Sequence, residues 1–133
     1  MEITVSIHPA EHPIAIMKLN GEINAATYME VVNKAQELFD NPARYLIIDL
    51  SGVTTVSSAG LVGLHKIALV YSGDPNMQVE KDESRPDFTH TSDARKFVKL
   101  LNPKPEVDES LKMAGLRLFF KVYNDLESAI GSF

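Results

Sequence analysis

Two adjacent serines, Ser57 and Ser58, are the residues whose type and position most suggest chemistry in this chain. The small residues Ala59 and Gly60 follow them and leave little steric cover over a serine hydroxyl. A serine in this setting can cap a helix or act as a nucleophile. Capping is the simpler of these roles, because serine is among the preferred residues at helix N-termini.

The nucleophile is disfavoured by the residues around the serines. A serine hydrolase of the common type carries its nucleophile in a G-x-S-x-G turn, and VSSAG lacks the first glycine. No histidine is placed by the sequence to act as its base. Phosphate-binding loops of the G-x-x-x-x-G-K-[ST] or G-x-G-x-x-G type are also missing, so no nucleotide cofactor is expected. The sequence favours a binding module over an enzyme, and a small hydrolase with Ser58 as nucleophile is the disfavoured alternative.

The four histidines do not form a recognisable metal site. His8 and His12 flank a proline-containing turn, His65 falls in a predicted helix, and His90 falls in a highly charged segment. None forms the i, i+4 pair on a helix that zinc proteases use, and without cysteine there is no Cys/His knuckle. We therefore expect no metal.

Composition limits the class of protein. The 133 residues are the size of one domain, and 44% of them are hydrophobic, which is enough for a packed core. The net charge of −5 without a basic run disfavours a nucleic-acid partner. No stretch approaches the roughly 18 apolar residues of a membrane span, and the first residues do not resemble a secretory signal. The length predicts a single domain over residues 1–133. The absence of cysteine agrees with a reducing cytoplasm, so we expect a cytoplasmic protein.

The serines are predicted to lie between a strand and a helix. Residues 45–50 form a short apolar run that is typical of a buried strand, and Ser51-Gly52 is predicted to end it. A helix then begins at Ser57 or Ser58, either of which could be its N-cap. The apolar residues that follow at helical spacing are Leu61, Leu64, Ala68 and Tyr71.

The rest of the chain alternates between strands and helices. Residues 3–7 and 14–19 are predicted to form two antiparallel strands, and Asn20-Gly21 to end the second. A helix capped by Asn24 follows, with its apolar face at Tyr28, Val31, Val32, Ala35, Leu38 and Phe39. Later elements are a strand at 97–101, a helix from Pro105 to Gly115 with Val107, Leu111 and Ala114 inside, a strand at 118–123 and a helix at 124–130. The order β-β-α-β-α-β-α-β-α predicts an α/β fold with a mixed, mostly parallel sheet.

Three phrases of the sequence resemble those of the STAS domain, the fold of bacterial anti-sigma factor antagonists. They are LNGEIN (19–24), DLSGVTTVSSAGL (49–61) and MAGL (113–116), in the order in which the family has them. By this resemblance Ser58 falls on the serine that a partner kinase phosphorylates. Ser57 falls where many members carry an acidic residue, and Asn24 replaces their usual aspartate. The resemblance implies a STAS-type fold with helices packed on the sheet.

The resemblance also implies a function. An anti-sigma factor antagonist binds an anti-sigma serine kinase in competition with a sigma factor, and so regulates transcription. The implied binding surface surrounds the start of the helix and comprises Asn24, Ser57, Ser58, Ala59, Gly60 and Leu61. A phosphoserine phosphatase is a further implied partner. The alternative within this fold is a constitutive scaffold module of a larger signalling or transport complex.

The segment 73–96 departs most from that family, whose members usually make this connection shorter. It contains two prolines, dense charge of both signs and few apolar residues, which predicts a mobile, inserted loop. Such a loop either has no role or contacts a partner.

Deleting most of residues 73–96 in favour of a short glycine-containing turn should change the melting temperature little, because the segment has few apolar residues to anchor it. Its amides should also exchange hydrogen rapidly. Thermal melts and hydrogen exchange on the intact and shortened chains test this. A loss of several kcal/mol on deletion would show that the segment packs.

Overall fold

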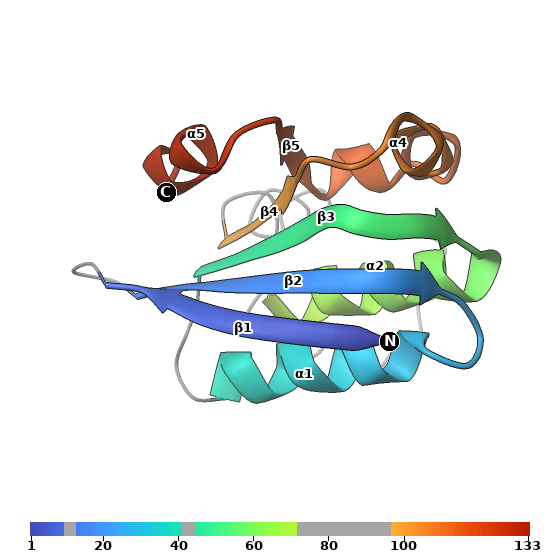
Figure 1. Cartoon of the computed structure of the whole chain (residues 1–133), viewed down its shortest axis with the longest axis horizontal. Coiled ribbons are helices and arrows are strands. Elements are labelled where there is room, and N and C mark those ends of the chain that lie inside the picture. The colour runs from blue at the N-terminus through green and yellow to red at the C-terminus, as the bar shows by residue number, and fades with distance from the viewer. Residues whose placement is uncertain (10–12, 41–44, 72–96) are drawn as a thin grey trace.

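A five-stranded sheet with the strand order β1-β2-β3-β4-β5 forms the centre of the molecule (Figure 1). The computed structural model describes residues 1–9, 13–40, 45–71 and 97–133, so the predicted loop at 73–96 lies outside the described residues. β1 pairs antiparallel with β2, and every other neighbouring pair is parallel, as the sequence predicts. The strands are β1 (Glu2–His8), β2 (Ile14–Ile23), β3 (Tyr45–Val56), β4 (Val98–Leu101) and β5 (Lys121–Tyr123).

Among the described residues, helices connect the parallel strands, and one helix follows the last strand. In chain order they are α1 (Tyr28–Asp40), α2 (Ser58–Tyr71), α4 (Pro105–Met113) and α5 (Leu126–Gly131), with a short 3-10 helix, η2 (Leu116–Leu118), before β5. Each parallel connection steps to the next strand in the same direction, so right-handed crossovers place the connecting helices on one face of the sheet. In Figure 1, α1 and α2 lie together beneath β1, β2 and β3. The predicted order of elements is confirmed, with η2 added.

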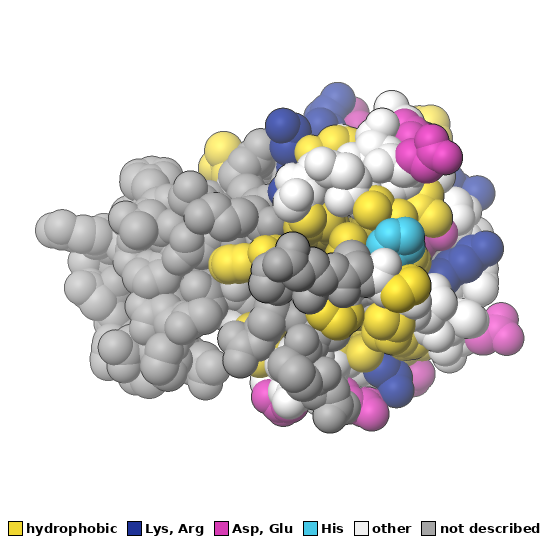
Figure 2. Space-filling model, turned by 90° about the vertical axis from the view of Figure 1, so that its left-hand side faces the viewer, with side chains coloured by type: hydrophobic (Ala, Val, Ile, Leu, Met, Phe, Trp, Pro, Cys, Tyr) yellow, Lys and Arg dark blue, Asp and Glu magenta, His cyan; other side chains and the backbone are white. Residues whose placement is uncertain are grey.

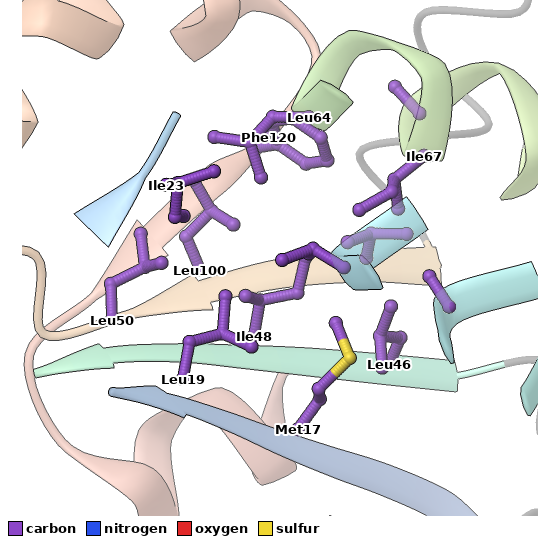
Figure 3. Packing of buried hydrophobic residues seen from close by; sticks show 14 of the residues in the cluster. Met17, Leu19, Ile23, Leu46, Ile48, Leu50, Leu64, Ile67, Leu100 and Phe120 are labelled. Atoms are coloured by element: carbon purple, nitrogen blue, oxygen red, sulfur yellow. The ribbon is translucent and has the colours of Figure 1, made fainter. Parts of the chain in front are cut away.

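The main core lies between this face of the sheet and its helices (Figure 3). It is built from alternate residues of the strands, because successive side chains of a strand point to opposite faces. The helices contribute the residues at three- and four-residue spacing that the sequence predicts. The largest fully buried aliphatic members are Met17, Leu19, Ile23, Leu46, Ile48, Leu50, Leu64, Ile67 and Leu100.

A smaller cluster covers the opposite face of the sheet under α5. Ile14, Ile47 and Leu101 alternate with the residues of the main core and pack with Ala129 of α5. The side chain of Asp125 caps α5 by accepting a hydrogen bond from the Ser128 N–H at 2.9 Å. This capped helix confirms the predicted C-terminal element and closes the second face of the sheet.

The strands β2 and β3 are longer than the sequence predicts, and the expected breaks at Asn20-Gly21 and Ser51-Gly52 are wrong. Gly21 pairs with Val53, which is fully buried, and Asn20 pairs with Gly52. A Cβ added at Gly52 would lie 2.8 Å from the Leu19 carbonyl oxygen. Gly52 therefore marks a close approach of two strands, and the pairing with β2 continues past it.

The last predicted strand is shorter than expected. Leu118 belongs to η2 and is 62% exposed, while Phe120 is fully buried. The cause is Gly115, which follows α4 with a φ of 77° and turns the chain into the 3-10 helix. Ala114, predicted to face inward, is exposed because α4 ends at Met113.

Gly52→Ala should destabilise the protein by about 1–3 kcal/mol, because the new methyl group overpacks against the Leu19 carbonyl and the Asn20 side chain. Gly131→Ala is the matched control, since a Cβ there meets nothing within 4 Å. Urea unfolding of both variants measures the difference. Equal stability of the two would mean that the close approach at Gly52 relaxes without penalty.

Candidate functional site

The structure assigns different positions to the two serines. Ser57 is the N-cap of α2: its Oγ accepts a hydrogen bond from the Gly60 N–H at 3.3 Å, and its carbonyl accepts one from the Leu61 N–H at 2.9 Å. Ser58 is the first residue of the helix, and its side chain is exposed. Of the two caps that the sequence allowed, the structure selects Ser57 and leaves Ser58 on the surface.

The start of α2 is attached to the end of β2. The Ser57 N–H donates a hydrogen bond to the Ile23 carbonyl at 2.9 Å, and Ile23 also pairs with Val56 at the end of β3. These contacts bring the ends of two neighbouring strands and the first turn of the helix to one place. Asn24, which directly follows Ile23, is therefore positioned beside the serines.

Gly60 is buried in this junction. A Cβ added to it would lie 2.5 Å from the Ile23 carbonyl oxygen and 2.8 Å from Cγ1 of Val56. The missing side chain would therefore point toward β2 and not over Ser58. The expectation that Gly60 keeps the Ser58 hydroxyl uncovered is wrong; the glycine instead allows the helix to pack closely on the strands.

Asn24 begins the turn that leads into α1. Its Oδ1 accepts a hydrogen bond from the Ala26 N–H at 2.9 Å, and its carbonyl accepts one from the Tyr28 N–H at 2.8 Å. The Asn24 N–H donates to Oγ1 of Thr27 at 2.9 Å. Asn24 thus caps the turn that precedes α1, and its predicted position as the N-cap of the helix is wrong, because the regular helix begins only at Tyr28.

The predicted surface residues differ in how far they reach solvent. Ser57 and Ser58 are exposed, whereas Asn24, Ala59 and Leu61 are partly buried. Sequence reasoning missed Val62, which is 51% exposed one turn after Ser58. Its outward position could have been read from the sequence, because Val62 falls outside the helical series Leu61, Leu64, Ala68 and Tyr71 that faces the core.

His65 continues the same face of α2 but does not reach Ser58. Seven residues along a helix correspond to about 10 Å of rise, which is too far for a hydrogen bond. The His65 ring packs edge-on against Phe119 at 5.0 Å. Burial, with a smaller contribution from the charge of Lys66, lowers the pKa of His65, so the folded protein favours the neutral ring. Because the folded state binds this proton less readily than the unfolded chain, the free energy of unfolding decreases as the pH falls from the ordinary histidine pKa through the lowered one.

Other kinds of site are not formed where the structure describes the chain. The described residues bring together no group of three His, Asp or Glu side chains that could hold a metal. None of the described helices is long and apolar enough to cross a membrane. A cavity of about 370 Å³ is lined by Lys112, Arg117, Phe120, Lys121 and Val122, and none of the predicted site residues takes part in it.

Comparison with known proteins agrees with the fold. Residues 7–70 match the STAS domain family model. An anti-sigma factor antagonist from Mycobacterium paratuberculosis has a TM-score of 0.66 at 18% identity, over 98% of this chain and 93% of that one. The Bacillus cell fate determinant SpoIIAA in its phosphorylated form has a TM-score of 0.57 at 15% identity, over 96% of this chain and 97% of that one. A Thermotoga maritima protein provisionally assigned as an anti-sigma factor antagonist has a TM-score of 0.70 at 16% identity, over 96% of this chain and 92% of that one.

Curated protein sequences give no match. The five-stranded, mostly parallel sheet with its helices is the fold of the SpoIIAA-like antagonists. The fold is the STAS fold, and the STAS domain family model matches residues 7–70, which comprise β2, α1, β3 and most of α2.

The two serines should respond differently to truncation. Ser57→Ala removes the cap hydrogen bond and should destabilise the protein by about 0.5–2 kcal/mol. Ser58→Ala is the matched control and should change stability by less than about 0.5 kcal/mol, as is usual for an exposed position. Thermal or urea unfolding of both variants measures the two losses of stability. A larger loss at Ser58 than at Ser57 would contradict the assignment of the cap.

Proposed function

We propose that this protein is an anti-sigma factor antagonist whose binding to an anti-sigma serine kinase is switched by phosphorylation of Ser58. The observation that carries the proposal is the position of Ser58, which is exposed on the first turn of α2 while Ser57 provides the cap. The hydroxyl of Ser58 is thus accessible to a kinase. Binding of the kinase frees a sigma factor, so the protein acts in transcription regulation in a bacterial cytoplasm.

The fold can accept a phosphate at this position. A phosphate adds about −1.5 to −2 charges at neutral pH and three acceptor oxygens. The helix dipole and the free N–H groups of a first turn favour such a charge, and the first turn of α2 contains no acidic residue. Phosphorylation of Ser58 should therefore leave the fold intact.

The same phosphate should oppose binding of the partner. The proposed surface comprises Asn24, Ser57, Ser58, Ala59 and Leu61, with Val62 as an apolar extension and Gly60 as its buried support. A doubly charged group at its centre would have to be desolvated when the kinase docks. A phosphoserine phosphatase would restore binding by removing it.

An enzymatic role has no support from the geometry at Ser58. The histidine that shares its helix face, His65, lies about 10 Å further along α2 and packs against Phe119. A protein-binding role requires no base and agrees with an exposed surface. The alternative, a constitutive scaffold module of a larger complex, would bind its partner without control by phosphorylation of Ser58.

Ser58→Asp should fold with at least the stability of the wild type, because a carboxylate near a helix N-terminus contributes roughly 0.3–1 kcal/mol. Its affinity for the anti-sigma kinase should nevertheless fall by at least about tenfold, equivalent to about 1.4 kcal/mol. Ser58→Ala should bind like the wild type. Calorimetric titration with the anti-sigma kinase encoded nearest to the gene measures all three affinities.

Ser57→Asp is the matched control, since it adds the same charge one residue away and aspartate can still cap the helix. We expect it to weaken binding less than Ser58→Asp does. Mass spectrometry after incubation with the kinase and ATP should place the phosphate on Ser58. Unchanged binding by Ser58→Asp, together with an unlabelled Ser58, would replace the switch by the constitutive scaffold.

A further inference from the structure

The strand β1 forms an open edge of the sheet. It pairs with β2 along all its seven residues, and the described part of the chain places no strand against its other side. Proteins commonly protect such an edge with lysine, proline or a bulge. β1 contains neither lysine nor proline, and its pairing with β2 runs without a register shift. Its outer edge is therefore available to another strand.

The apolar residues of β1 are arranged symmetrically about Val5. An antiparallel copy of the strand, related by a two-fold axis at Val5, places Val5 opposite Val5 of the partner subunit. It places Ile3 opposite Ile7 of the partner subunit, and Ile7 opposite the partner's Ile3. Pairs of β-branched residues are favourable cross-strand neighbours. The segment EITVSIH thus carries an apolar row that complements itself.

The polar residues of β1 follow the same symmetry. Thr4 falls opposite the partner's Ser6, and hydroxyl pairs of this kind form hydrogen bonds across strands. Glu2 falls opposite the partner's His8, and by symmetry His8 falls opposite the partner's Glu2. An acidic residue therefore faces an imidazole at both ends of the paired strands, and no like charges meet.

The exposure of Ile7 agrees with a missing neighbour. Ile7 is 51% exposed, although the residue paired with it on β2, Ala15, is fully buried. Figure 2 looks toward the end of the sheet where β1 ends, and it shows hydrophobic side chains gathered beside a histidine there. A second strand beyond β1 would cover Ile7 with an isoleucine. A solvated edge would leave this apolar side chain in water.

We propose that β1 is the interface of a symmetric dimer, in which the β1 strands of two copies pair antiparallel and join two sheets into one. The symmetry is two-fold and closed, so the contact uses the same strand of both copies and leaves neither β1 edge open. The partner strand is β1 of a second copy of this chain. In antiparallel self-pairing, apolar residues face apolar residues, hydroxyl residues face each other and Glu2 faces His8, and an unrelated strand would not require this arrangement.

The dimer would leave both Ser58 positions free. Glu2 pairs with Asn20 near the end of β2 that meets α2, whereas His8 pairs with Ile14 at the other end. The two-fold axis at Val5 places the Glu2 end of one copy beside the His8 end of the other, so the two Ser58 surfaces lie at opposite ends of the joined sheet. The proposal is thus independent of the phosphoswitch: dimerisation should be the same for wild type, Ser58→Ala and Ser58→Asp.

Sedimentation velocity of the full chain from micromolar to millimolar concentrations tests the interface. The wild type should form dimers, and Ile7→Lys should weaken them by at least about tenfold, since a charge on an edge opposes strand addition. Leu126→Lys, which changes an exposed leucine on α5 (40% exposed), is the matched control and should dimerise like the wild type. A monomeric wild type over this range overturns the proposal, as does equal weakening by the control.

A charge exchange tests the register without touching the apolar row. Glu2→Arg and His8→Glu should each weaken the dimer, because the first removes the carboxylate that faces His8 of the partner subunit and the second places two carboxylates opposite each other. The double variant places an arginine opposite a glutamate and should recover the wild-type association. Failure of the double variant to recover overturns the register, and circular dichroism confirms that each variant is folded.

A disulfide gives an independent test, because the chain contains no cysteine. Directly opposed residues of antiparallel strands have Cα atoms about 4.5–5.5 Å apart, which lies within the range that a disulfide spans. Val5→Cys should therefore form a covalent dimer on mild oxidation. Ile7→Cys is the control: its two thiols would be offset by four residues, about 13 Å, and should not react. Cross-linking of Ile7→Cys at the rate of Val5→Cys would contradict the symmetric pairing.

Discussion

The contact between Ile23 and the first turn of α2 is the constraint on which the rest of the site depends. The Ile23 carbonyl accepts the Ser57 N–H at 2.9 Å, and the missing Cβ of Gly60 would lie only 2.5 Å from the same oxygen. A side chain at Gly60 would force the helix away from the strand and remove this hydrogen bond. The glycine thus joins the ends of β2 and β3 to the start of α2.

This junction separates the roles of the two serines. Both polar groups that Ser57 can offer a helix start, its carbonyl and its hydroxyl, are occupied within the fold. Ser58 follows one residue later, where the side chain of a first-turn residue points outward into solvent. Modification of Ser58 therefore changes the surface charge without removing a contact that holds the helix in place. A switch placed on the capping serine would instead alter stability and binding together.

The shape of the surface around Ser58 agrees with a partner of protein size. The cavity of about 370 Å³ lies between α4 and β5, away from the predicted site residues, and Ser57 and Ser58 are exposed. Val62 adds an apolar side chain at 51% exposure to the polar start of the helix. An apolar centre surrounded by polar groups is the general arrangement of a protein–protein interface.

The sequence by itself determined the order of elements, the inward faces of α1 and α2 and the position of the serine pair at the start of α2, because these follow from periodicity and capping chemistry within a few residues. Only the tertiary structure decided what depends on neighbours distant in sequence. Gly52 reads locally as a break, yet pairing with Asn20 continues the strand through it. Gly60 reads as an opening above Ser58, yet the carbonyl of Ile23 fills the space beside it. A glycine has no side chain to show which neighbour it approaches, so its role is set by the backbone that the fold brings against it.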